Sequence, residues 1–144
     1  MIVPDANLLL YAYDTTSPFH EEARRWWQDC LSGDEPVGLC AVVLFAFVRI
    51  GTHPRASKKP MSIRTADSQV EGWLRRRVCQ FIVMEEVDVA RALELLRVAG
   101  TAGDLTTDAQ LAAIALRLGA TIHTADTDFK RFRGVRLFNP LDAV

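Results

Sequence analysis

The chain has 144 residues, of which 49% are hydrophobic, and this predicts one domain over residues 1–144 with a substantial core. No apolar run is long enough to cross a bilayer, and no basic region precedes the first apolar run, so neither a membrane span nor a signal peptide is expected. The net charge of −1 does not indicate that the chain as a whole binds nucleic acid. The three cysteines, Cys30, Cys40 and Cys79, lack C-x-x-C spacing, which predicts buried thiols in a reducing, cytoplasmic setting.

Strand and helix patterns alternate along the chain. Short apolar strands are expected at residues 2–3, 37–39, 79–84, 120–123 and 135–138. Helical periodicity predicts helices at residues 8–13, 19–31, 41–50, 62–76, 87–99 and 108–118, with a short helical turn at 128–132. Asn7 is the expected cap of the first helix, and Gly119 the expected end of the last long one. The alternation predicts an α/β fold, with a small parallel sheet of about five strands and helices on both faces.

The apolar faces of three helices can be read from their spacing. Trp26, Trp27 and Trp73 recur at helical intervals and are expected in the core or at a dimer contact. Ala66, Val70 and Leu74 are expected to point inward with Trp73, and the helix at 87–99 has an apolar face of Val89, Leu93 and Leu96.

Four aspartates follow strands or begin a helix. Asp5 follows the first strand, Asp108 opens the helix at 108–118, and Asp126 and Asp128 follow the strand at 120–123. Each has an ordinary structural explanation, as a helix cap, a helix-dipole partner or a turn residue. Together they are expected at one edge of the sheet, where mutual repulsion would be relieved by a divalent cation. Mg²⁺ and Mn²⁺ prefer such oxygen ligands and activate water against phosphodiesters, whereas the isolated histidines do not indicate zinc.

Charge is unevenly distributed in the middle of the chain. Residues 36–66 contain no Asp or Glu, whereas the acids gather elsewhere, including at Asp104. The basic side chains of the same stretch are Arg49, Arg55, Lys58, Lys59 and Arg64. Such a segment suits contacts to RNA phosphates, and it is equally typical of a solvated loop.

Four motifs together resemble a known family. IVPDANLLLYA, VVLFAFVRIGTHPR, TTDAQLAAIALRLGA and HTADTDFKRF, in this order, are similar to the PIN domain and more closely to the VapC toxins of bacterial VapBC pairs. The resemblance implies a three-layer α/β/α fold and an endoribonuclease that depends on Mg²⁺ or Mn²⁺ and cuts tRNA or rRNA. It also implies a homodimer and a cognate VapB antitoxin that binds in the active-site groove.

The resemblance assigns roles to particular residues. Asp5, Asp108 and Asp126 match the catalytic, metal-binding acids, and Asp128 matches a further metal-binding acid of the family. Asn7 and Thr124 match polar residues that hold the acids in place. The basic residues from Arg49 to Arg64 are then candidates for RNA or antitoxin contacts, and Arg49 in particular could meet an antitoxin carboxylate.

One acid of the family pattern is absent. The helix at 41–50 carries Ala46 where an acid is expected, with Ala41 as the alternative position, and no acid lies between Glu35 and Asp67. The absence is either natural or an engineered inactivation. Two functions therefore stay open, namely an active ribonuclease and an impaired module that binds RNA or antitoxin. A phosphatase of the aspartyl-phosphate type is disfavoured, because that chemistry needs a second Asp where Asn7 stands.

Overall fold

The sheet is parallel throughout and has five strands. The computed structural model describes residues 1–142. Its strands are β1 (Ile2–Pro4), β2 (Val37–Cys40), β3 (Cys79–Ile82), β4 (Thr121–His123) and β5 (Arg136–Phe138). They run in the order β3-β2-β1-β4-β5, so β1 is central and pairs with both β2 and β4. In this register Pro4 lies opposite His123, and the residues that follow β1 and β4 therefore emerge side by side.

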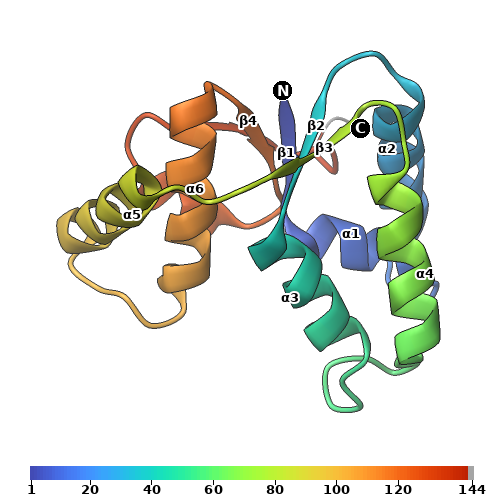
Figure 1. The fold of residues 1–144 in the computed structure, drawn as a ribbon. Helices are drawn as coiled ribbons and strands as arrows, with labels where there is room; N and C mark the ends of the chain where they lie inside the picture. Colours follow the sequence, from blue (N-terminus) through green and yellow to red (C-terminus); the bar gives the residue numbers. More distant parts are fainter. Residues whose placement is uncertain (143–144) are drawn as a thin grey trace.

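Helices cover both faces of this sheet. They are α1 (Ala6–Tyr13), α2 (His20–Ser32), α3 (Ala41–Gly51), α4 (Ile63–Leu74), α5 (Glu86–Ala99), α6 (Leu105–Leu118) and the 3₁₀ helix η1 (Thr127–Arg131). Figure 1 shows α5 and α6 on one side of the sheet and α1 to α4 on the other. The predicted three-layer α/β/α architecture is confirmed.

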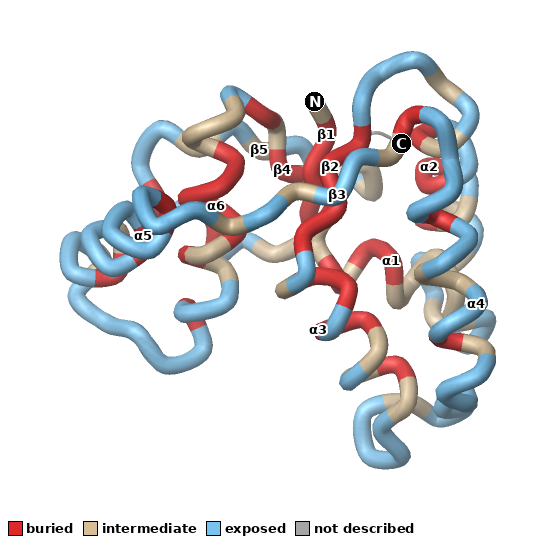
Figure 2. Tube along the Cα trace, in the orientation of Figure 1, coloured by how far each residue is buried: buried red, intermediate tan, exposed pale blue. Residues whose placement is uncertain are grey.

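The core lies along β1 and β2 and the helices that face them. Every residue of β1 and β2 is buried, and Figure 2 shows the buried backbone continuing into α1, α3 and α6. Phe47 of α3 packs against Trp73 of α4, with ring centroids 4.8 Å apart, and Trp73 packs edge-on against Trp27 of α2. Trp26 is buried as well, so of the two predicted locations for the tryptophans, the core or a dimer contact, the structure shows the core.

Most element boundaries fall within two residues of those predicted, but two starts differ in ways that affect the candidate site. Asn7 is not a cap, because α1 begins at Ala6 and Asp5 is its N-cap. α6 begins at Leu105, so Asp108 lies at the end of its first turn rather than at its start. Gly119 ends α6 with φ 62°, a left-handed conformation that glycine adopts readily, as predicted.

The predicted apolar faces of α4 and α5 are partly wrong. Leu74 is 40% exposed, while α4 buries Ala66 and Trp73. In α5, Val89 and Leu93 are 47% and 62% exposed. The buried stripe of α5 is instead Asp88, Ala92 and Leu96, because Asp88 pairs with Arg117 of the neighbouring α6. Within residues 1–142, no helix combines the length and apolar character needed to cross a bilayer.

Candidate active site

Asp5 is held by two hydrogen bonds at the carboxyl end of the central strand. One carboxylate oxygen, Oδ1, accepts from the backbone N–H of Ala6 at 2.8 Å and so caps α1. The other, Oδ2, accepts from Thr124 Oγ1 at 2.8 Å. The capping explanation of Asp5 is therefore correct as local structure, and it uses only one of the two carboxylate oxygens.

Thr124 connects this acid to the segment after β4. Its side chain is buried, and its Oγ1 also accepts from the backbone N–H of Asp126 at 2.9 Å. Asp126 in turn caps η1, because its Oδ1 accepts from the backbone N–H of Asp128 at 2.8 Å. The turn explanation of these two acids is thus correct as local structure, and it fixes where their carboxylates lie.

Asp108 reaches the same place from α6. Asp108, Asp126 and Asp128 can each direct one carboxylate oxygen so that all three lie within 4.8 Å of one another. Asp5, Asp108 and Asp126 also line a single cavity of about 350 Å³. The structure therefore brings Asp5 together with Asp108 and Asp126, which follow it by more than a hundred residues in the chain. Asp128 lies beside Asp108 and Asp126 but outside the lining.

The lining of the cavity shows which of the two candidate alanines of α3 faces the acids. Ala46 lines it, together with Val43 and Arg49 of the same helix, whereas Ala41 does not. Ala46 is therefore the position at which the α3 wall lacks a carboxylate. The remaining polar lining on α1 is Asn7, whose buried Oδ1 has no hydrogen-bond partner among residues 1–142. Thr124 thus hydrogen-bonds to one of the acids, whereas the buried Oδ1 of Asn7 bonds to none of the described residues.

The carboxylates are crowded and partly removed from water. Burial raises the pKa of Asp5, and repulsion from Asp126 adds to it, although the hydrogen bonds from Thr124 and Ala6 act in the opposite direction. Burial and the charges of Asp5, Asp126 and Asp128 raise the pKa of Asp108 to about 7. Simultaneous ionisation of these carboxyl groups is therefore unfavourable, and a bound divalent cation would offset the repulsion between their charges. The donor set of carboxylates and one free amide oxygen fits Mg²⁺ or Mn²⁺.

The predicted basic residues separate into groups. Arg49 lines the acid cavity, and it shares a smaller cavity of about 220 Å³ with His53 and Arg55. Lys58 and Lys59 are exposed in the loop after α3 and do not line the acid cavity. Arg64, on α4, borders an apolar groove of about 740 Å³ between α3 and α4.

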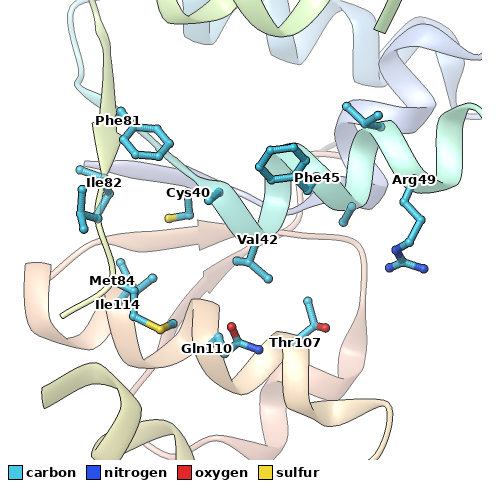
Figure 3. Close-up of a pocket in the computed structure, with 14 residues that line it drawn as sticks. Cys40, Val42, Phe45, Arg49, Phe81, Ile82, Met84, Thr107, Gln110 and Ile114 are labelled. Carbon is cyan, nitrogen blue, oxygen red and sulfur yellow. The ribbon is translucent and has the colours of Figure 1, made fainter. Parts of the chain in front are cut away.

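A second large cavity adjoins the acids and was not predicted. It has a volume of about 700 Å³ and shares Val42, Ala46, Arg49 and Thr107 with the acid cavity. Figure 3 shows Phe45 and Phe81 on its α3 and β3 side and Gln110 on its α6 side. Phe45 is 71% exposed. Its place in a continuous apolar run (CAVVLFAFV) hides this exposure, so the sequence has no clear signal for this surface.

Comparison with known proteins agrees with this geometry. A model of the PIN domain matches residues 2–135. The chain belongs to the PIN domain family. It is 42% identical over 141 residues to Ribonuclease VapC33 of Mycobacterium tuberculosis, which covers 98% of this chain and 99% of that protein, so the predicted kinship with VapC proteins is confirmed.

Solved structures confirm the PIN fold. Mycobacterium tuberculosis VapC20, described as a sarcin-ricin loop cleaving toxin, superimposes with a TM-score of 0.72 at 20% identity and covers 94% of this chain and 99% of that one. A chain of VapBC2 from Rickettsia felis, bound to a DNA fragment from its promoter, gives 0.68 at 22% identity and covers 96% and 98%.

Proposed function

We propose that this PIN domain is the toxin of a type II toxin–antitoxin pair and an endoribonuclease that depends on Mg²⁺ or Mn²⁺. The observation that carries the proposal is the single cavity lined by Asp5, Asp108 and Asp126, whose carboxylates come from three separate segments. The raised pKa values of Asp5 and Asp108 are what a metal-binding cluster has before its cation neutralises it. Kinship with a protein named as a ribonuclease at 42% identity supports the same conclusion.

The residues of the cavity have distinct proposed roles. Asp5, Asp108 and Asp126 would hold the cation, with Asp128 as a further ligand from η1. In sites of this kind Mg²⁺ or Mn²⁺ activates water as a nucleophile and offsets negative charge on the phosphate. Thr124 keeps the Asp5 carboxylate in one orientation through its 2.8 Å hydrogen bond. Asn7 lines the same cavity from α1.

Basic residues beside the cavity would bind the RNA backbone. Arg49 lines the acid cavity, and Arg55 lines a smaller cavity that also contains Arg49. Neither forms an ion pair within residues 1–142, so both guanidinium groups are available to phosphates. Lys58 and Lys59 would extend this contact along the loop, while Arg64 lies farther away on α4. Contacts of this kind give affinity without sequence readout, so we propose that tRNA or rRNA is selected by its folded shape as well.

Two protein partners belong to the proposal, a VapB-type antitoxin and a second copy of the chain. Exposed apolar side chains beside the cavity support association with protein, because Phe45 and Phe81 are 71% and 52% exposed. An acidic or polar antitoxin segment that reaches the cavity would meet Arg49, the cation of its lining. A cytoplasmic location stays a prediction from the sequence.

A second candidate function is supported by one observation. Ala46 faces the acids from α3 and contributes no oxygen, so a domain that binds RNA or antitoxin without cutting is the alternative.

Cleavage of total RNA with Mn²⁺ or Mg²⁺ separates the two functions. We expect cleavage by the wild type, loss of cleavage in Asp5→Asn and Asp108→Asn, and no change in Asp67→Asn, which removes an exposed acid of α4. An inert wild type that gains activity on Ala46→Glu would establish the impaired module instead. Cleavage that survives both Asp5→Asn and Asp108→Asn would refute the assignment of these acids.

A further inference from the structure

We propose that Asp104 supplies an additional carboxylate to the metal site, from the start of α6, in place of the acid that α3 lacks. The proposal rests on the metal-dependent function above. Asp104 lines the acid cavity with Asp5, Asp108 and Asp126, so four carboxylates and one cation, Arg49, are the charged side chains of the lining. A cavity with this excess of negative charge suits a divalent cation.

The backbone at the start of α6 puts two of these acids on one helix face. Asp104 is the N-cap of α6, but its φ of −65° and ψ of −20° are already helical. Residues four apart on a helix are neighbours, with Cβ atoms about 5–6 Å apart. Asp104 and Asp108 therefore lie on one face of the helix, and both line the cavity.

The side chain of Asp104 is not used for capping. An aspartate at an N-cap ordinarily accepts a hydrogen bond from a backbone N–H of the first turn, yet Asp104 makes no such bond. Because its backbone is helical rather than extended, its carboxylate is not directed at those N–H groups. Asp104 is exposed and forms no ion pair within the described chain, so its carboxylate can turn toward a cation.

The α3 wall provides the complementary observation. Ala46 is 8% exposed and lines the same cavity with a methyl group, so no side-chain oxygen approaches from α3 at that position. Val42 and Val43, the neighbours on that wall, are also apolar. With Asp104 of α6 as an additional ligand, the site needs no acid at position 46 of α3.

The test measures binding of Mn²⁺ to the whole chain by titration calorimetry. We expect Asp104→Asn and Asp104→Ser to raise the Kd about tenfold or more, because each removes the carboxylate while keeping a residue suited to an N-cap. Asp104→Glu, which retains a carboxylate, and Asp67→Asn, which removes an exposed acid outside the cavity, should bind as the wild type does. In Asp104→Asn, the added change Ala46→Glu should restore affinity. Circular dichroism should show that all of these variants are folded at the temperature of the titration.

The outcomes separate this inference from the proposed function. If Asp104→Asn and Asp104→Ser bind Mn²⁺ as tightly as the wild type, while Asp108→Asn does not bind, Asp104 is no ligand and the metal-dependent function stands. If the wild type does not bind Mn²⁺ at millimolar concentration, both the metal-dependent function and the role of Asp104 are refuted.

Discussion

Replacement of Asp108 by Asn should stabilise the metal-free protein at alkaline pH. The Asp108 carboxyl has a pKa of about 7 in the folded protein, against an ordinary value of 3.8, because it is partly buried near three other acids. The folded state therefore holds a proton that the unfolded state releases between pH 4 and 7. Stability from this group is complete below pH 3.8 and is lost as the pH rises through about 7.

The size of the effect follows from this difference in pKa. At 1.36 kcal/mol per pH unit, a rise from 3.8 to about 7 corresponds to about 4 kcal/mol. Asp108 is only half-buried, and solvent screens its interactions, so about 2 kcal/mol is the expected loss between pH 4 and 8. Asn keeps the shape of the side chain without its charge, and it should remove most of this loss.

Urea unfolding in EDTA at pH 5, 6.5 and 8 measures this effect. The free energy of unfolding of the wild type should fall with pH relative to that of Asp108→Asn. Mn²⁺ at pH 8 should restore it in the wild type and should not raise it in Asp108→Asn. Asp67→Asn is the matched control, and its pH dependence should follow the wild type. Parallel pH profiles for the wild type and Asp108→Asn would refute the reasoning that these acids repel one another in the fold.

Three further predictions concern other polar groups of the fold. Arg117→Met should lower the free energy of unfolding by about 3 kcal/mol, measured with urea, because Asp88 is 1% exposed and would lose its 2.9 Å ion pair. Thr124→Val should weaken Mn²⁺ binding about tenfold in calorimetry, because Asp5 loses the hydrogen bond that orients it. Burial raises the pKa of the Cys40 thiol to about 12, so iodoacetamide at pH 8 should label Cys40 only after unfolding, as mass spectrometry would reveal.

Each of these predictions has a contrasting outcome. Arg75→Met removes an exposed ion pair of α4 and should cost less than about 1 kcal/mol, so an equal loss in Arg75→Met and Arg117→Met would contradict the first. An unchanged Kd for Mn²⁺ in Thr124→Val would contradict the second. Labelling of Cys40 in the native protein at the rate of the unfolded chain would contradict the third.

The convergence of the acids could be predicted because it follows from chain topology. β1 and β4 are short strands that Asp5 and Thr124 follow directly, and parallel strands bring their carboxyl ends to one edge. The helical ends marked by glycine, such as Gly119, were equally clear. These features depend on local chemistry and on general rules of parallel sheets, both of which a sequence carries.

The parts that could not be predicted depend on tertiary partners. α5 has two stripes of similar apolar character, and the ion pair between Asp88 and Arg117 selects the one that leaves Leu93 exposed. Asp104 lies in a polar loop with no periodicity, so only its position at the cavity distinguishes it from other surface acids. Asn7 and Asp5 are both plausible caps in sequence, and the backbone of Asp5 decides between them.

The hydrogen bond between Thr124 and Asp5 joins residues 119 positions apart. During synthesis on the ribosome, the first acid emerges early, while its partner and Asp126 belong to the last strands of the sheet to be made. A nascent chain shorter than about 125 residues lacks Asp126 and, with it, a closed ligand set. The proposed nuclease would therefore be inert until nearly the whole chain has left the exit tunnel, and the ribosome that produces it would not face an active product midway through translation.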